Sequence, residues 1–380
     1  MLYWLLFQIL HKYIPTFRVF GYITTRVALA SLTALAISLA VGPWMIGKLR
    51  AWSFGQHIRE EGPQSHRKKA GTPTMGGLLI VTAIVVPTLL WADLSNPYIW
   101  LALLGLIGFG AIGFLDDFAK IAKKRNLGLT ARQKFWAQVF IAMVIGFCLL
   151  LLHANHAWKY STAVNIPFFK QFKPDLLIYP LAKNFWTFPL AFVPFYLFIV
   201  FVMVGSSNAV NLTDGLDGLA IGLMIIASSA MTALTYVSSN TAFSSYLDLA
   251  HLPNSQELTI FCASMTGASI GFLWYNCHPA QVFMGDVGSL ALGGGLGIVA
   301  VLIKQEILLL FIGGIYVVEA LSVILQVGSY KMRNGKRIFK MAPIHHHFEA
   351  LGWPESKVIV RFWIAGLVMA LFALSTLKLR

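Results

Sequence analysis

The chain has 380 residues, of which 57% are hydrophobic and 12% are charged, and its mean hydropathy is +0.71. Soluble domains are roughly 45–50% apolar and about 25% charged, so this composition excludes an ordinary water-soluble protein and indicates a membrane protein. The formal net charge of +14 is spread over several loops and accompanies no nucleic-acid motif, so it argues against nucleic acid and favours anionic lipids and phosphorylated substrates as partners.

Ten apolar segments are long enough to cross a bilayer as helices, which takes about 20 residues each. They are residues 24–45, 74–92, 97–116, 134–153, 187–208, 214–236, 258–276, 286–304, 307–330 and 358–377. The preceding stretch, Met1 to Leu10, is too short to cross and lacks the features of a signal peptide, so we expect it at the membrane interface. Because the apolar segments are evenly spread, residues 1–380 are predicted to form one all-α membrane domain.

Lysine and arginine are unevenly distributed among the loops. The connections 46–71, 117–134 and 331–357 each hold six of the 29. The positive-inside rule places these loops in the cytoplasm, so with ten spans both termini lie on the outer face. Five aspartates independently fall at cytoplasmic ends of spans: Asp116, Asp117, Asp214, Asp217 and Asp286. They predict an active site on the cytoplasmic rim of the membrane domain.

The first cytoplasmic loop passes from a basic segment into a turn rich in glycine and threonine. Residues 66–77 read HRKKAGTPTMGG and include Lys69 and Thr74. Such a segment can hold a phosphate group, although it lacks the spacing of a P-loop. The alternative is an ordinary basic loop that only orients the protein in the membrane.

Asp116 and Asp117 end the third apolar segment, and Lys120 follows them. Neighbouring side chains on a helix point about 100° apart, so we expect one carboxylate to engage the reacting centre and the other to orient a base or a cation. Carboxylates at a membrane edge are costly unless they are paired or used. Simple pairing with the nearby lysines is the competing interpretation.

Residues 208–218, NAVNLTDGLDG, combine helix-capping side chains with two acids. Asn211 or Thr213 can cap a helix, and Asp214 and Asp217 lie on one face of its first turn. A single acid there could merely complement the helix dipole. Two acids beside glycines, which permit close backbone approach, favour a binding site.

The turn between the seventh and eighth spans carries Asn276, Phe283 and Asp286. Asp286, at a helix start beside glycines, suits Mg²⁺, which prefers one or two carboxylates plus phosphate oxygens. Phe283 can stack on a nucleobase, and Asn276 can hydrogen-bond to the amide edge of the base. An aromatic residue at a membrane interface can also be a simple anchor.

The ninth span contains Glu319 and Gln326 on one helical face, and the loop after it contains residues 343–349, PIHHHFE. Glu319 must face the bundle interior, where structural pairing and substrate contact both fit the sequence. Three successive histidines cannot all reach one ion. We therefore expect His345 and His346 to donate to phosphate or to act in general acid–base chemistry.

Taken together, these segments resemble the signatures of the phospho-N-acetylmuramoyl-pentapeptide transferase family, in the order that the family has them. The matching segments are Gly71 through Gly77, the Asp116–Asp117 pair, Asn208 through Asp217, Phe283 through Ser289 and Ala342 through His347. The resemblance implies a ten-span enzyme of the bacterial inner membrane, acting as a homodimer. It also implies Mg²⁺-dependent transfer of phospho-N-acetylmuramoyl-pentapeptide from its UDP carrier to undecaprenyl phosphate, with release of UMP.

The resemblance also implies residue roles. Asp286 would be the magnesium ligand, and Asp116 and Asp117 would be the catalytic pair, with Asp286 and His345 also catalytic. The residues assigned to substrate binding are Lys69, Thr74, Lys120, Asn211, Asp214, Asp217, Asn276, Phe283, Gln326 and His346. Asp116 either deprotonates the lipid phosphate or only positions a basic group, because a phosphate monoester needs little help near neutral pH. Direct attack of the lipid phosphate, without a covalent enzyme intermediate, is the favoured mechanism.

Two alternative functions stay open. A related transferase that uses UDP-N-acetylglucosamine would share the aspartates and the membrane plan, and the PIHHH loop favours the muramoyl donor. A secondary transporter would place its polar site near the middle of the membrane between repeated halves. In this sequence the acids crowd one edge and no repeat is visible.

Overall fold

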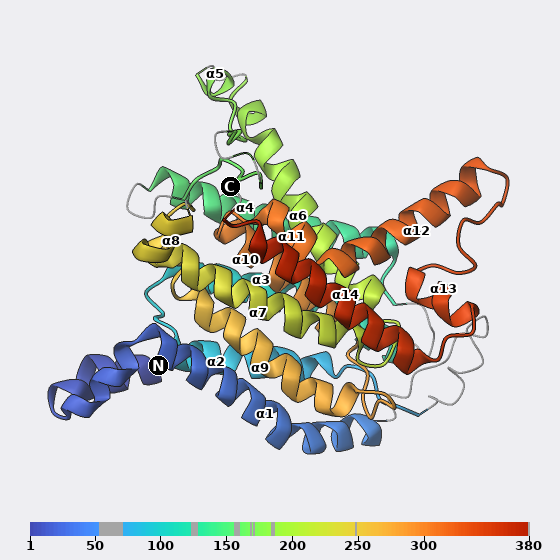
Figure 1. Ribbon diagram of the computed structural model, residues 1–380, viewed down its shortest axis with the longest axis horizontal. Helices are drawn as coiled ribbons and strands as arrows, with labels where there is room; N and C mark the ends of the chain where they lie inside the picture. The colour runs from blue at the N-terminus through green and yellow to red at the C-terminus, as the bar shows by residue number, and fades with distance from the viewer. Residues whose placement is uncertain are drawn as a thin grey trace.

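The structure is a computed structural model that is almost wholly helical (Figure 1). It describes residues 1–52, 71–122, 128–155, 160–167, 169, 172–183, 187–247 and 249–378. Within these ranges, β structure is limited to isolated bridge residues, among them the antiparallel pair Ala163 and Asp175. The predicted all-α class is therefore confirmed.

Every predicted apolar segment contains a helix. The longer helices are α1 (Ile23–Ala51), α2 (Gly77–Trp91), α3 (Pro97–Ala122), α4 (Ala131–Ala154), α6 (Val193–Thr213), α7 (Leu219–Ser239), α9 (Leu258–Asn276), α10 (Gly285–Leu302), α12 (Gly314–Met332) and α14 (Glu355–Ser375). The shorter ones are η1 (Trp4–Ile9), η2 (Leu10–Lys12), η3 (Pro15–Gly21), α5 (Tyr179–Ala182), η5 (Phe188–Phe192), α8 (Thr241–Leu247), η6 (Pro253–Ser255), α11 (Glu306–Ile312) and α13 (Ile344–Ala350).

Nine helical segments in the described part of the chain are long and apolar enough to cross a membrane. The remaining apolar helix, α2, has 15 residues and contains Pro87. The structure thus supports a multi-pass membrane protein, while the tenth crossing and the outward-facing termini stay predictions.

Helix α10 forms the centre of the bundle, packed between α3 and α6 (Figure 1). Its sequence is rich in glycine and alanine, and small residues let neighbouring helices approach closely. On α6, the hydroxyl of Ser206 donates to the Gly293 carbonyl at 2.9 Å, and that of Ser207 donates to the Leu290 carbonyl at 3.1 Å. The most enclosed helix is therefore fixed by close packing and by hydrogen bonds from its neighbour.

Glycines hold the start of α10 against two other helices. Gly113 of α3 packs on the backbone carbonyl of Asp286, and Gly77 of α2 packs on the backbone of Gly288. A Cβ at either position would meet main-chain atoms, which cannot move aside as a flexible side chain can. The end of α3 is consequently fixed beside Asp286.

Ion pairs join helices at the opposite end of the bundle. Arg26 of α1 donates to both carboxylate oxygens of Glu257, which precedes α9, at 2.8 and 2.9 Å. The same carboxylate accepts the Asp93 backbone N–H at 2.7 Å. Between α10 and α11, buried Lys304 pairs with buried Glu306 at 2.7 Å. These contacts link α1 and the α2–α3 loop to the start of α9, and separately link the end of α10 to α11, away from the predicted active site.

Helix α12 departs from the bundle after a break at Gly313 (Figure 1). Its first turns stay attached because the Tyr316 hydroxyl donates to the Ala220 carbonyl of α7 at 2.7 Å. Farther along, Ile324 and Leu325 are exposed, as expected for side chains that face lipid. The chain then returns to α13, which carries the three histidines.

Candidate functional site

Three of the predicted aspartates meet where α3 ends and α10 begins. Asp116, Asp117 and Asp286 each offer a carboxylate oxygen, and these atoms lie within 4.8 Å of one another. The ammonium group of Lys120 lies 2.7 Å from Asp116, 3.2 Å from Asp117 and 2.9 Å from Asp286. Lys134, in the first turns of α4, contacts Asp286 at 2.9 Å. We call these five residues the rim cluster.

The rim cluster contains more acid than base. Asp116 and Asp117 are 4% and 3% exposed, and three carboxylates share two lysines. Like charges brought together away from water repel strongly unless a cation compensates them. The ammonium group of Lys120 already contacts all three carboxylates, so these carboxylates can hold a cation between them. Carboxylate oxygens that leave room for phosphate oxygens are also the ligands that Mg²⁺ prefers.

Backbone and side-chain donors fix the orientation of each carboxylate. Asp116 accepts the Leu129 N–H at 2.7 Å, whereas Asp117 accepts the Val287 N–H of α10 at 3.3 Å. The side-chain amide of Asn211 donates to Asp286 at 2.7 Å. The two adjacent aspartates therefore share Lys120 but accept different backbone donors, and Asn211 lies directly at the cluster. The predicted division of roles between the two carboxylates stays a prediction.

Asp214 lies beside the rim cluster, just after α6. Its removal from bulk water raises its pKa to about 8, with further contributions from the negative charges of Asp286, Asp117 and Asp217. The rise in pKa therefore reflects burial first and the surplus of nearby acid second. Four of the five predicted aspartates thus concentrate negative charge at one place.

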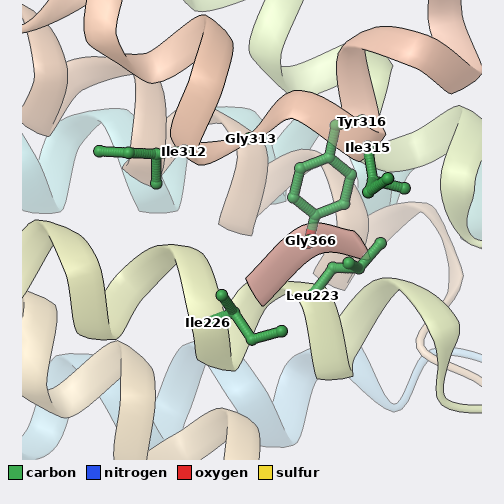
Figure 2. Close-up of a pocket in the computed structure, with 7 residues that line it drawn as sticks. All are labelled: Leu223, Ile226, Ile312, Gly313, Ile315, Tyr316 and Gly366. Atoms are coloured by element: carbon green, nitrogen blue, oxygen red, sulfur yellow. The ribbon is translucent and has the colours of Figure 1, made fainter. Parts of the chain in front are cut away.

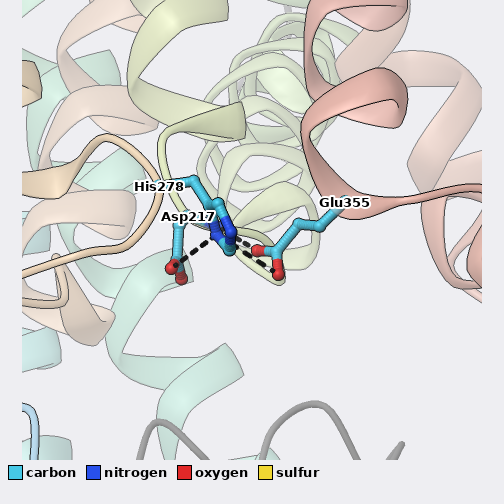
Figure 3. Close-up of side chains that lie close together, drawn as sticks. All are labelled: Asp217, His278 and Glu355. Carbon is cyan, nitrogen blue, oxygen red and sulfur yellow. Dashed lines mark hydrogen bonds and ion pairs between the residues drawn. The ribbon is translucent and has the colours of Figure 1, made fainter.

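Asp217 turns toward a second group of side chains (Figure 3). His278 Nδ1 lies 3.4 Å from Asp217 and 3.6 Å from Glu355, at the start of α14. Both carboxylates also accept backbone donors: the Ala280 N–H reaches Asp217 at 3.1 Å, and the Asp217 N–H reaches Glu355 at 3.0 Å. Although these residue types could hold a metal, an imidazole between two carboxylates accounts for the arrangement as an ion-paired junction of three segments.

Several other predicted residues shape the loops around the cluster. Asn276 is buried, its amide donating to the Val282 carbonyl at 2.8 Å and its carbonyl accepting the Gly218 N–H at 3.1 Å. Both hydrogen bonds go to the main chain, so Asn276 holds the turns that follow Asp217 and precede Asp286. Its predicted contact with a base is not tested by this arrangement.

Phe283 and Thr74 lie on paired loops. The backbone N–H of Phe283 donates to the Pro73 carbonyl, and its carbonyl accepts the Gly76 N–H, each at 2.9 Å. Thr74 is directly beside Gly285, which precedes Asp286. Phe283 is partly exposed, as stacking on a ligand would require. Lys69, the other residue predicted in this region, lies outside the described residues.

The histidine loop meets the site from α13. His345 is fully buried, and its Nδ1 lies 3.0 Å from Glu319. His346 pairs with Glu349 at 2.6 Å. Gln326 accepts the Ile338 and Phe339 N–H groups and donates to the Phe339 carbonyl, so it fastens the loop between α12 and α13. Sequence reasoning assigned these residues to catalysis or binding, whereas the visible contacts of Gln326 and His345 are structural.

Three residues of this region were missed from the sequence. Lys134 was counted as a cytoplasmic charge, although its position in the first turn of a span facing the aspartates could have indicated a role. His278 and Glu355 gave no usable signal, because they approach Asp217 only through the fold. Residue spacing along the chain cannot reveal such a contact.

A small apolar pocket lies elsewhere, at the break between α11 and α12 (Figure 2). It is lined by Leu223, Ile226, Ile312, Gly313, Ile315, Tyr316 and Gly366. The pocket offers no carboxylate, lysine or histidine. It does not suit a phosphorylated ligand, so the rim cluster is the candidate site.

Two family models match parts of the chain. Residues 99–304 match the model of glycosyl transferase family 4, and residues 69–81 match phospho-N-acetylmuramoyl-pentapeptide-transferase signature 1. Proteins named phospho-N-acetylmuramoyl-pentapeptide-transferase from Solibacter usitatus and Acidobacterium capsulatum are 64% and 62% identical to the chain over 380 residues. The protein of that name from Koribacter versatilis is 61% identical over 383 residues. Each alignment covers 100% of both proteins.

Proposed function

The chain belongs to the phospho-N-acetylmuramoyl-pentapeptide-transferase family, and we propose that it transfers phospho-N-acetylmuramoyl-pentapeptide from its UDP carrier to undecaprenyl phosphate. The product is the first lipid-linked peptidoglycan precursor, and UMP is released. We further propose that the protein is a homodimer of the bacterial inner membrane, with ten spans, both termini outward and its site facing the cytoplasm. The concentration of basic residues in the loops on the site's side supports this orientation.

The rim cluster is the observation that supports the proposal most directly. A nucleotide-sugar diphosphate arrives from water, whereas a polyprenyl phosphate is fixed at the membrane surface. The two anions can meet only at the rim, where Lys120 and Lys134 lie beside Asp116, Asp117 and Asp286. Charge stabilisation by positioned groups is commonly the largest contribution to this type of catalysis.

We propose Mg²⁺ as the cofactor, held by Asp286 with an oxygen from Asp116 or Asp117. Bound there, the ion would supply positive charge to the diphosphate and to the departing UMP. The protein's own groups fit this role because Asn211 directs Asp286 and a backbone N–H directs each of the other two carboxylates. Lys120 and Lys134 then lower the repulsion between the two phosphorylated reactants.

We propose a single displacement. An oxygen of the lipid phosphate forms a bond to the phosphorus that carries the sugar, and the bond from that phosphorus to the UMP oxygen breaks. Asp116 and Asp117 are both engaged by Lys120 and by backbone N–H groups, which suits carboxylates that orient cations rather than a carboxylate nucleophile. No covalent enzyme intermediate is needed, because the lipid phosphate is itself the nucleophile.

The deciding experiment supplies the purified chain with undecaprenyl phosphate and either UDP-N-acetylmuramoyl-pentapeptide or UDP-N-acetylglucosamine. We expect Mg²⁺-dependent UMP release and a radiolabelled lipid product with the muramoyl donor. UMP release with the N-acetylglucosamine donor alone would support the related transferase instead. Uptake of a sugar nucleotide into liposomes without UMP release would support a transporter.

A further inference from the structure

A fully buried acid–histidine pair connects α12 to α13. Glu319 and His345 are each 0% exposed, and Glu319 Oε2 lies 3.0 Å from His345 Nδ1. A carboxylate is expensive to bury without a partner, so the pair explains why Glu319 is tolerated inside a membrane helix. Neither the rim cluster nor its lysines contact the pair among the interactions of the described residues.

Each member of the pair also has a buried atom without a hydrogen-bond partner in the described chain. These atoms are Glu319 Oε1 and His345 Nε2. Buried polar atoms in native proteins are usually satisfied, and those that are not often mark a functional site. A contact optimised only for stability would not leave both second atoms unpaired.

The unpaired nitrogen of His345 is directed at the side of the site that is proposed to bind the nucleotide sugar. His345 Nε2 packs directly on Gly215, which leaves no room for a Cβ there. Gly215 lies in the loop from Asp214 to Asp217, whose acids flank the rim cluster and the His278 junction. The imidazole therefore connects the interior of α12 to the loop that is proposed to bind the nucleotide sugar.

Glu319 also decides which nitrogen carries the proton. An ionised carboxylate only accepts hydrogen bonds, so Nδ1 of His345 must donate its N–H to Glu319. In the neutral ring, Nε2 is then the acceptor facing Gly215. The position of Glu319 thus fixes both the orientation and the tautomer of His345.

We propose that Glu319 is a positioning residue that holds His345 so that Nε2 meets the Asp214–Asp217 loop and gains its hydrogen-bond partner when the nucleotide-sugar donor binds. This inference rests on the proposed function, because it assigns the donor to that loop. His345 is the contacting group, and Glu319 acts only through it.

The first test replaces Glu319 with glutamine, which has the same shape without the charge. Removing a buried charge should leave the melting temperature unchanged or raise it. The neutral amide no longer holds the ring proton on Nδ1, however. When its NH₂ group faces the ring it donates to Nδ1, which moves the ring proton to Nε2. We therefore expect E319Q to lower kcat/KM for the donor at least tenfold and to leave KM for the lipid phosphate unchanged.

Glu306→Gln is the matched control. Glu306 is an equally buried carboxylate, but it pairs with Lys304 at the other end of the bundle. E306Q should lower the melting temperature while the surviving folded protein keeps the wild-type kcat/KM for the donor. If E319Q behaves like E306Q, with lower stability and normal kinetics, Glu319 is merely structural and the inference is wrong.

A double-mutant cycle tests whether Glu319 acts through His345. In a His345→Gln background, E319Q should change kcat/KM for the donor less than twofold, because the residue that Glu319 positions is already gone. If the double variant instead loses kcat/KM by the product of the two single losses, each tenfold, the inference is wrong. Should H345Q fail to fold, Glu319→Asp, which retains the charge but shortens the reach, must recover part of the activity that E319Q loses.

The tautomer can be measured independently of turnover. In protein with ¹⁵N-labelled histidine, the His345 resonances should show protonated Nδ1 in the wild type and protonated Nε2 in E319Q. An unchanged tautomer would overturn the inference even if the enzyme is active. Absence of UMP release by the wild type would instead overturn the proposed function, and the tautomer measurement would still decide the role of Glu319.

Discussion

The two ends of the helical bundle use similar charged side chains in opposite ways. At the predicted outer end, Arg26 faces Glu257 through two hydrogen bonds, and Lys304 faces Glu306. Each of these buried cations contacts a carboxylate of its own. Such pairs, once formed, are strongly destabilising to break. This end therefore has the charge balance expected of structural ion pairs.

The predicted cytoplasmic end, which holds the rim cluster, is not balanced. Asp116, Asp117 and Asp286 share Lys120 and Lys134, and a further acid lies close by. A surplus of negative charge in a poorly solvated place lowers stability, so its presence indicates a use. The comparison teaches that the ratio of acids to bases, rather than their burial, separates the functional end from the structural one.

Removing one acid from the unbalanced end should lower kcat more than any other predicted substitution. We expect Asp286→Asn to lower kcat at least about 1000-fold, because the residue proposed to hold the cation loses its charge. The fold should be retained, since Lys120 keeps Asp116 and Asp117 as partners. UMP release and the melting temperature, measured on the same preparation, check the two parts of this prediction.

The control is Asp93→Asn, at the outer end, where the side chain accepts hydrogen bonds from Ser95. It should change kcat less than about twofold, as expected for a surface substitution. Equal losses in D93N and D286N, or full activity in D286N at ordinary Mg²⁺ concentrations, would contradict a functional distinction between the two ends.

Breaking a pair at the balanced end should act on stability instead. Glu257→Gln leaves the buried guanidinium of Arg26 without an anion, which costs about 3 kcal/mol of unfolding free energy by analogy with other buried pairs. Reversible denaturation in detergent measures the loss. Below the melting temperature, kcat should stay within about twofold of the wild type, since only the unfolded fraction changes.

Replacing both partners, as in R26M/E257M, should recover much of the lost stability, because neither charge is then left unpaired. A double variant as unstable as E257Q would show that the packing around the pair, rather than its charge, stabilises this end. Loss of kcat in E257Q below its melting temperature would show that the two ends are coupled.

The geometry of the unbalanced end can be disturbed without changing its charge. Gly113→Ala places a Cβ against the Asp286 backbone and should separate α3 from α10. We expect an overpacking cost of about 1–3 kcal/mol and about 100-fold lower kcat, because small displacements of catalytic groups have effects of this size. Circular dichroism melts and UMP release measure the two quantities.

Gly108→Ala is the matched control on the same helix. Its Cβ would lie 3.0 Å from the end of the Ile141 side chain, which can rotate away. It should reduce kcat less than about threefold, because no catalytic backbone has to move. If G113A is as active as G108A, the close contact between α3 and the start of α10 does not position the aspartates.

Most of the fold could be predicted because it depends on local properties. A long apolar run forms a helix wherever it lies, so all ten segments were found, including 74–92, whose helix is only 15 residues long. The meeting of Asp116, Asp117 and Asp286 also followed from the sequence. Spans ending on the same side bring their terminal residues to one surface, whichever helices are neighbours.

Contacts decided by which helices are neighbours could not be predicted. Asp217 was expected to join the other aspartates, yet the start of α14 brings Glu355 beside it and directs it to His278. His345 was expected to donate to phosphate or to act in acid–base chemistry, and that role stays a prediction. Its enclosure by α12 beside Glu319 had no signal in the sequence. The sequence gives the kind of residue at each point, while tertiary packing decides which way the residue faces.

The smallest predicted effect is a difference in pH dependence between two acids. Burial and neighbouring negative charges raise the pKa of Asp214 to about 8. Burial would also raise the pKa of Asp175, but hydrogen bonds from Thr162, the Leu177 N–H and Tyr179 lower it overall. The first acid belongs to the unbalanced end and the second to a loop on the predicted outer side.

The two shifts have opposite consequences for stability. Because its folded-state pKa is raised, Asp214 binds a proton more tightly in the folded protein, so its contribution to stability falls as pH rises from about 4 through 8. In metal-free buffer, wild-type protein should therefore lose about 2–4 °C of melting temperature relative to Asp214→Asn between pH 6 and 9, roughly the effect of 3 kcal/mol in a chain of 380 residues. Asp175 has a lowered pKa, so its stabilisation is complete above the unfolded-state pKa, and Asp175→Asn should differ from the wild type by the same amount at pH 6 and pH 9. If D214N and D175N show the same pH dependence, the surplus of acid does not extend to Asp214, and the cytoplasmic end is closer to balance than its geometry indicates.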